Sequence, residues 1–338
     1  MTIEPFGAVD GTDVFEVTLL NGTGAQARIL TWGAVVRDLT VPTDRDPQPV
    51  VLGLDTLADY IAHSPYFGAI VGRVANRIGG ARFAIDGEAF PVDANEGRNQ
   101  LHGGSRGFGS RVWTVIDHTR AGVTLALVSE DGDMGYPGRL TAVCTYTLLD
   151  PATLRVVLEA TTDRPTPVNL TNHCYFNLDG GQDISSHHLM IAADYITPTG
   201  DDLIPTGEVT GIGGTPYDFR SLRPIGASEL MRERVAYDVN FVLRAGADEW
   251  GHAATLKSLN NNMSLQLWTT EPGLQFYDGH LIDIPVPGLR GLSYGRHAGL
   301  CLEPQRFPDS PNKAHFSPCI LRPGSVSRQV SELRFGLD

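Results

Sequence analysis

The sequence is poor in basic residues and has no long apolar run. It contains 26 Lys and Arg against 39 Asp and Glu, a formal net charge of −13, and no basic cluster is longer than a pair. Such a chain offers nothing to nucleic-acid phosphates or anionic lipids, so we expect no nucleic-acid and no membrane partner. No segment approaches the ~18 apolar residues needed to cross a bilayer. The first residues, MTIEP, are neither basic nor continuously apolar, so we expect no secretion.

Cysteine is also scarce. The four cysteines lie far apart, without C-x-x-C spacing, and are too few to form a disulfide framework in 338 residues; they are Cys144, Cys174, Cys301 and Cys319. We therefore expect reduced, mostly buried thiols and a cytoplasmic protein. Motifs for zinc proteases, nucleotide binding and serine hydrolases are missing. His187 and His188 would point to opposite faces of a strand, so we expect no metal site and no cofactor.

Helical patterns are few, whereas period-two alternation of apolar residues recurs along the chain. Alternation at 142–148, 154–160 and 263–268 predicts strands that are buried on one face, and glycine and proline turn signals separate such runs. The better helical patterns cover only 56–62 and 228–235. With 41% hydrophobic residues the chain can bury a large core. We predict an all-β fold, a large antiparallel β-sandwich, as one domain over residues 1–338.

Two loop-like segments carry polar residues that could bind a ligand. Residues 72–78 hold two arginines and one asparagine beside the apolar run 67–71. Forked guanidinium donors suit the binding of hydroxyls or carboxylates; the alternative is a pair of surface arginines whose stems cover apolar area. His102 precedes Gly103 and Gly104, which would let the backbone approach a ligand. The alternative there is a hydrogen-bonded loop histidine among turn glycines.

Two strand-like segments place polar side chains on otherwise apolar strands. At 169–178, alternation puts His173 and Tyr175 on a polar face, whereas Cys174 points to the core and is no candidate nucleophile. At 300–305, Glu303 shares a face with Cys301, opposite the leucines. A carboxylate in such poor solvation is a candidate for a tuned pKa. The alternative for Glu303 is a salt bridge to an arginine such as Arg306.

In order and spacing, these signals resemble one family, the aldose 1-epimerases or galactose mutarotases. The resemblance runs through nearly the whole chain and covers nine motifs: LGLD (52–55), GRVANRI (72–78), NQLHGG (99–104), GYPG (135–138), LTNHCYFNL (170–178), TPYDFR (215–220), EPGLQFY (271–277), LEPQRFPD (302–309) and LRPG (321–324).

The resemblance implies a sugar held in a shallow groove over one sheet of the sandwich. It implies that His173 is the general acid, Glu303 the general base and His102 a second histidine at the sugar. It further implies a set of substrate-binding residues, which we take as Asn76, Arg77, Tyr175, Asp238 and Gln275. The chain departs from the family pattern at four positions, which are Cys174, Val239, Pro304 and Val326.

The implied reaction is the interconversion of the α and β anomers of free aldohexoses such as galactose and glucose. One base takes the proton of the C1 hydroxyl and one acid protonates the ring oxygen, so no metal or cofactor is needed. We expect ionised Glu303 and protonated His173 in the free protein; burial would raise the pKa of Glu303 and Arg77 would lower it. The alternatives are a carbohydrate-binding or sensing domain without turnover, and a mutarotase of hexose 6-phosphates. The sequence leaves the oligomeric state open.

Overall fold

The computed structural model describes residues 2–226 and 235–337, and it confirms the all-β prediction. The predicted alternating runs lie in three long strands, β13 (Leu140–Leu149), β14 (Thr153–Thr162) and β24 (Met263–Thr269). Along β13, buried and partly exposed residues alternate without interruption. In the part of the chain described, all the named strands that are hydrogen-bonded to one another run antiparallel.

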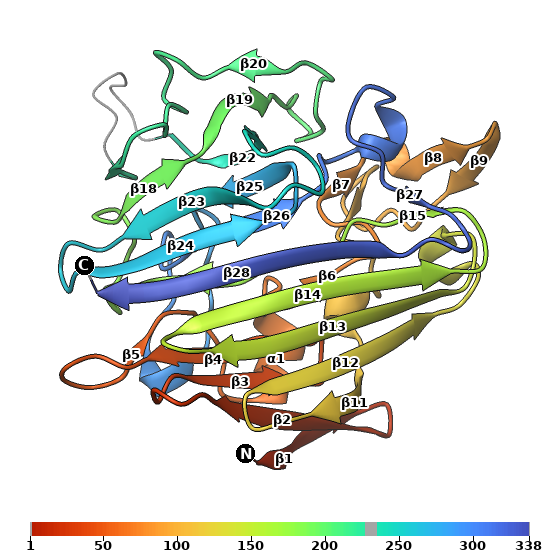
Figure 1. The fold of residues 1–338 in the computed structure, drawn as a ribbon. Helices are drawn as coiled ribbons and strands as arrows, with labels where there is room; N and C mark the ends of the chain where they lie inside the picture. Colours follow the sequence, from red (N-terminus) through yellow and green to blue (C-terminus); the bar gives the residue numbers. More distant parts are fainter. Residues whose placement is uncertain (1, 227–234, 338) are drawn as a thin grey trace.

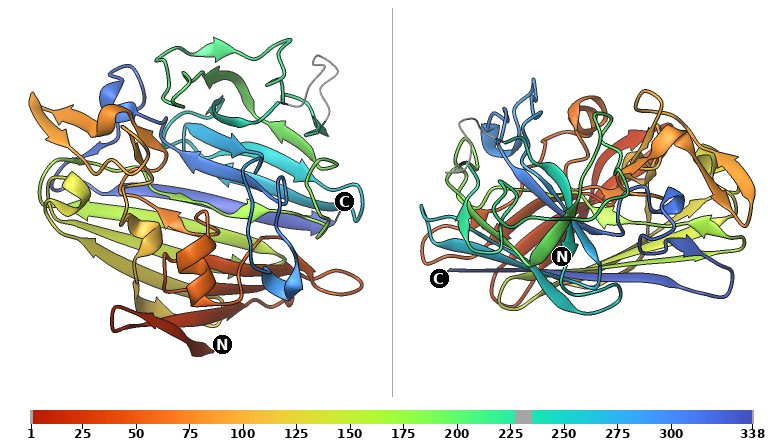
Figure 2. Two further views of the ribbon diagram at one scale, coloured as in Figure 1. Left: turned by 180° about the vertical axis from the view of Figure 1, so that it is seen from behind. Right: turned by 90° about the horizontal axis from the view of Figure 1, so that it is seen from above.

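The largest layer is a nine-stranded sheet (Figure 1). Its strands follow the order β11 (Thr114–His118), β12 (Gly122–Ser129), β13, β14, β28 (Ser327–Leu337), β24, β23 (Gly251–Lys257), β18 (His188–Ile191) and β21 (Arg223–Pro224). The last long strand of the chain, β28, is therefore central, between β14 and β24. This sheet is seen edge-on in the right-hand view of Figure 2, with the rest of the molecule above it.

Two further sheets form most of the opposing layer. The six-stranded sheet has the order β17 (Tyr175–Phe176), β26 (Leu300–Gln305), β25 (Gly273–Tyr277), β22 (Asp238–Leu243), β19 (Ala193–Thr197) and β20 (Thr210–Gly211). The five-stranded sheet contains β1 (Ile3–Val9), β2 (Thr12–Leu20), β3 (Gln26–Leu30), β4 (Val36–Val41) and β5 (Gln48–Pro49). Small ribbons pair β6 (Ile70–Val71) with β16 (Thr171–Asn172), β7 (Arg77–Ile78) with β10 (Gln100–Leu101), β8 (Arg82–Ile85) with β9 (Glu88–Pro91), and β15 (Thr166–Pro167) with β27 (Ile320–Leu321).

Helical structure is limited, as the sequence predicts. The pattern at 56–62 forms the helix α1 (Leu57–His63), which Thr56 caps by accepting a hydrogen bond from the backbone of Asp59 at 3.1 Å. The second predicted helix, at 228–235, lies almost wholly outside the described residues. The short 3-10 turns are η1 (Gly79–Ala81), η2 (Phe108–Ser110), η3 (Asp133–Gly135), η4 (Leu289–Gly291) and η5 (Ser310–Asn312). Among the described helices, none has the length and apolar character of a membrane span.

The main hydrophobic core contains residues of all three large sheets. It determines which face of β26 is buried and which face is free to line a binding site. Leu300 and Leu302 are buried in this core, and burial of a leucine contributes roughly 1.5–3 kcal/mol. A one-residue slip of β26 would move both leucines out of the core and put Glu303 into it, so the register is strongly specified. Cys174 also lies in the core, as alternation predicts, and all four cysteines are buried free thiols.

Candidate functional site

A groove of about 640 Å³ lies over the face of the six-stranded sheet that is turned away from the main core. All eight residues proposed from the sequence line it: Asn76, Arg77, His102, His173, Tyr175, Asp238, Gln275 and Glu303. They come from strands β7, β17, β22, β25 and β26, from the loops that follow β16 and β10, and, for Asn76, from the loop before β7. The fold therefore gathers residues that lie more than two hundred positions apart into one hollow.

Strand register explains how the polar floor of this groove forms. Gln275 on β25 pairs directly with Glu303 on β26, so the two side chains stand next to each other on one face. The Nε2 of Gln275 donates to the Asp238 carboxylate at 2.6 Å, and its Oε1 accepts from Gln305 Nε2 at 3.4 Å. These bonds orient the amide, and with it the acceptors and donors that the groove offers to a polar ligand.

Glu303 and His173 form the centre of the site. His173 Nε2 lies 3.7 Å from Glu303 Oε2, and the two residues are only 5% and 3% exposed. Oε2 of Glu303 is buried and has no hydrogen-bond partner among the described residues. The salt bridge to Arg306 that was the alternative for Glu303 is not made, because Arg306 pairs with Asp248 at 2.7 Å and with Glu271 at 3.3 Å.

His102 is held in one orientation by its neighbours. Its Nδ1 accepts the backbone N–H of Asn76 at 3.1 Å, so the neutral ring carries its proton on Nε2. The rings of Tyr66 and His173 lie at 4.6 Å and 5.2 Å from it. Gly103 is required here, because a Cβ at that position would stand 1.9 Å from the carbonyl oxygen of residue 72. The glycine thus serves close backbone packing that brings the histidine to the groove.

The triad His102, His173 and Glu303 has the composition of a zinc site, and its ligand atoms lie within 4.8 Å of one another. A metal ligand, however, must offer a lone pair. Because Nδ1 of His102 already accepts the Asn76 N–H, its Nε2 holds the proton and acts as a donor. The set therefore fits hydrogen bonding to hydroxyl groups and does not fit a metal ion.

The two arginines of residues 72–78 have different surroundings. Arg77 lies in the groove, where Glu96 binds it through two bonds of 2.6 and 2.8 Å, and its Nη1 is 3.9 Å from Asp238. Arg73 is buried away from the groove, and its guanidinium donates to Ser129 and to the carbonyl of Pro137. The segment therefore supplies one site residue and one residue that holds loops together.

Comparisons with known proteins identify the family of the chain. The sequence model described as aldose 1-epimerase matches residues 16–334. Galactose mutarotase of Bos taurus is 39% identical over 97% of this chain and 96% of its own length, and aldose 1-epimerase of Escherichia coli is 37% identical over 98% of both. The crystal structure of a GalM/aldose epimerase homologue from C. elegans has a TM-score of 0.90 at 31% identity, covering 96% of this chain and 99% of that one. The chain belongs to the aldose 1-epimerase family.

In this family member, burial shifts the pKa values of Glu303 and His173 in opposite directions. Burial raises the pKa of Glu303 well above its usual value, the nearby Asp238 raises it further, and Arg77 offsets only part of this. Burial lowers the pKa of His173 to about 4, and it also lowers that of His102. Both shifts oppose the expected combination of ionised Glu303 and protonated His173 in the free protein, because burial disfavours the charged form of each group.

Three residues that contact the groove residues were not identified from the sequence. Glu96 binds Arg77 from a loop that has no periodic pattern. From another loop, the ring of Tyr66 stacks on His173 and lies tilted against His102. Cys301 lies with its sulfur 3.5 Å from Nδ1 of His173, and burial raises the pKa of this thiol. For Cys301 a signal existed, because alternation places it on the same face as Glu303.

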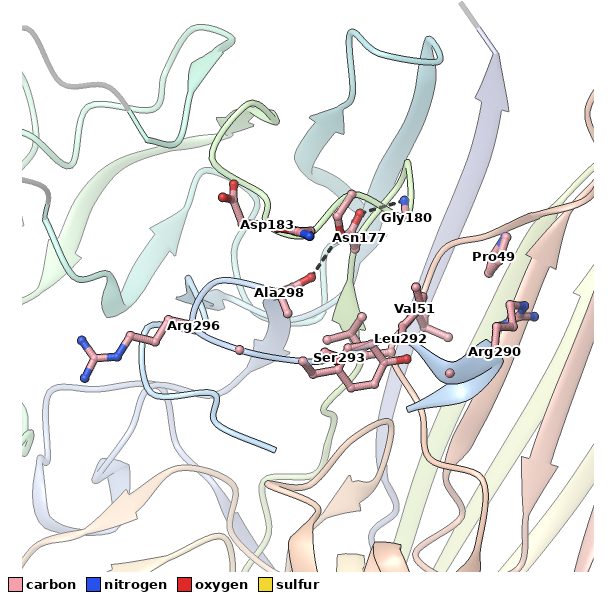
Figure 3. A pocket seen from close by; sticks show the side chains of 16 residues that line it. Pro49, Val51, Asn177, Gly180, Asp183, Arg290, Leu292, Ser293, Arg296 and Ala298 are labelled. Atoms are coloured by element: carbon pink, nitrogen blue, oxygen red, sulfur yellow. Dashed lines mark hydrogen bonds between the residues drawn. The ribbon is translucent and has the colours of Figure 1, made fainter. Parts of the chain in front are cut away.

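A second hollow, of about 520 Å³, lies away from these residues (Figure 3). Asn177 lies at its edge, but the Asn177 amide is already used: its nitrogen donates to the carbonyls of Gly181 and Ala298, and its oxygen accepts from the backbone of Gly180. Arg290 is paired with Asp38 at 2.6 Å. These polar groups are satisfied within the protein, so the groove at Glu303 is the candidate active site.

Proposed function

We propose that this chain interconverts the α and β anomers of free aldohexoses, galactose and glucose among them, by opening and reclosing the sugar ring. The observation that supports this most strongly is the buried, unpartnered Oε2 of Glu303, which lies 3.7 Å from Nε2 of His173. The reaction needs a base and an acid that act on two oxygens bonded to the same carbon. An acid and a base this close to each other meet that demand.

The chemistry follows from the pair. Glu303 takes the proton of the C1 hydroxyl, and His173 donates a proton to the ring oxygen as the bond between C1 and that oxygen breaks. The product is the open aldehyde. Rotation about the C1–C2 bond presents the opposite face of the carbonyl, and the ring closes with the two proton transfers reversed. This step uses ionised Glu303 and protonated His173, and the transfer of one proton from Glu303 to His173 produces both forms.

The other groove residues have roles in holding the sugar. Asp238 and Gln275 present hydrogen-bonding groups side by side. The Nε2–H of His102 and the side-chain Nδ2 of Asn76 are further donors. Tyr175 contributes its ring, which stacks on His173 at 5.1 Å, because its hydroxyl donates to the carbonyl of Pro65. The role of Tyr175 is therefore to support His173 and to form a wall of the groove.

Two alternatives are less well supported. A binding domain without turnover would need Asp238 and Gln275, but it would have no use for a buried carboxylate against a histidine. A hexose 6-phosphate mutarotase would need free cationic groups, whereas Arg77 is neutralised by Glu96. We further propose that residues 1–338 act as one domain, and that the protein works in the cytoplasm on a free monosaccharide.

A polarimetric time course tests this function. Freshly dissolved α-D-galactose and α-D-glucose should reach equilibrium rotation faster with the protein than without it. The control is the Glu303→Gln variant, which keeps the side chain's shape but removes the base. If the wild-type protein leaves the rate unchanged for both sugars while calorimetry still shows binding, the binding-domain alternative replaces the enzyme.

A further inference from the structure

A third histidine lines the groove and has no part in the chemistry above. His280 follows the end of β25 and has a side chain that is 23% exposed. Its Nδ1 lies 2.7 Å from Oδ1 of Asp278, whose side chain is fully buried. No sequence motif singled out this pair, because the two residues stand in a turn beyond the last alternating position.

The turn that carries His280 is anchored on several sides. The backbone N–H of His280 also donates to the Asp278 carboxylate, at 3.2 Å, and the backbone N–H of Asp278 donates to the carbonyl of Tyr237 at 3.0 Å. A Cβ on Gly279 would stand 2.2 Å from the carbonyl oxygen of residue 299, so the turn packs tightly against the loop before β26. These contacts hold the imidazole ring in place without a ligand.

The carboxylate determines which nitrogen of His280 faces a ligand as an acceptor. A carboxylate accepts hydrogen bonds, so Nδ1 of His280 carries the ring proton, and the neutral ring keeps its lone pair on Nε2. No described residue is hydrogen-bonded to that Nε2. His102 has the opposite tautomer, because a backbone donor occupies its Nδ1. The groove thus pairs a donor histidine with an acceptor histidine.

The position of His280 indicates which part of a sugar it would meet. Ring contacts lead from His173 through Tyr175 and Tyr277 to His280, at centroid distances of 5.1, 6.1 and 5.2 Å. Two aromatic rings therefore separate His280 from His173, which places His280 at the hydroxyls far from C1.

We infer that His280 determines sugar specificity by accepting a hydrogen bond from a hydroxyl remote from C1, and that Asp278 is the residue that positions it. The inference rests on the proposed function, since it takes the groove to hold an aldose with C1 between Glu303 and His173. It adds a residue that touches substrate but does not transfer a proton. Its loss should therefore weaken sugar binding and leave ring opening intact.

The test is a double-mutant-type cycle, in which the wild type and His280→Leu are each measured with D-galactose and with analogues that lack one hydroxyl. In His280→Leu, KM for D-galactose should rise about 3- to 10-fold, the worth of one hydrogen bond, while kcat stays within a factor of about three. D-Galactose analogues that lack the 4-hydroxyl or the 6-hydroxyl are the matched substrates. For the analogue that lacks the contacted hydroxyl, His280→Leu should change KM by less than a factor of about two.

His297 provides the matched control. Its Nδ1 lies 3.5 Å from the other oxygen of Asp278 and bonds to the Asp278 carbonyl at 2.9 Å, but it is not one of the groove-lining residues. His297→Leu should therefore leave KM for every sugar unchanged. An equal rise of KM in both variants, or no rise in His280→Leu, would overturn the inference.

Two measurements keep the test independent of turnover and of folding. Calorimetric binding of D-galactose to His280→Leu and to the wild type tests the contact even if the wild type shows no mutarotation, a result that would count against the proposed function alone. For the positioning role, the nitrogen NMR shifts of His280 should show Nδ1 protonated in the wild type and mixed tautomers in Asp278→Asn. The same tautomer in both proteins would refute the role of Asp278, and His280→Gln should restore part of the affinity.

Discussion

The low pKa of His173 makes the stability of the protein depend on pH in a way that can be calculated. Burial lowers this pKa from 6.5 to about 4. As the pH falls through 6.5, the unfolded chain binds a proton at this histidine and the folded protein does not, so folding stability is lost. Between pH 7 and pH 5 the loss from this one group is roughly 2 kcal/mol, and it reaches roughly 3 kcal/mol below pH 4.

Urea unfolding of the wild type and of His173→Asn at pH 7 and pH 5 measures this loss. Other groups titrate in both proteins, His102 among them, so their contributions largely cancel in the comparison. Between the two pH values the wild type should lose roughly 2 kcal/mol more than the variant. An equal loss in the two proteins would show that His173 has an ordinary pKa in the folded state, and the reasoning about burial at the acid–base pair would fail.

Five further predictions concern activity. Glu303→Gln should lower kcat by about two to four powers of ten without unfolding the protein, as steady-state kinetics and circular dichroism would show; near-native kcat would refute its role as base. His102→Asn should both raise KM and lower kcat, because its Nε2–H faces the sugar, and a change in neither would exclude that contact. The profile of kcat/KM should be a bell whose acid limb reports proton uptake by His173, near pH 4, and whose alkaline limb reports proton loss from Glu303; a profile flat from pH 4 to 9 would contradict this pair. Cys174→Ser should be close to neutral for kcat, and EDTA should not change activity, whereas a loss restored by added Zn²⁺ would refute the argument against a metal.

The sequence predicted what depends on strand periodicity. The position of Glu303 opposite the leucines of β26 follows from a period of two and from a core that must hold those leucines. The face of His173 was also predicted, although the strand is interrupted: β16 ends at Asn172 and β17 begins at Tyr175. The alternation of side chains continues across this short break, and for that reason the predicted face of His173 was correct.

Contacts between loops could not be predicted from the periodicity of the sequence. Glu96 meets Arg77, and Asp278 meets His280, because loops and turns of particular shape bring them together, and neither shape has a repeating signal. The direction of the pKa shift of Glu303 could not be predicted from the sequence either. It depends on whether burial, which raises the pKa, outweighs Arg77, which lowers it. Burial prevails, and the pKa of the Glu303 carboxyl is raised and not lowered.

The most direct test of the central claim is exchange NMR on D-galactose at anomeric equilibrium. The measurement follows the transfer of magnetisation between the α and β anomeric protons, so it observes interconversion itself in the absence of any net reaction. With catalytic amounts of the wild-type protein, exchange peaks between the two anomers should appear and should grow with protein concentration, and with Glu303→Gln they should fall to the level of buffer. If the wild type produced no more exchange than buffer while still binding galactose, ring opening by Glu303 and His173 would be excluded.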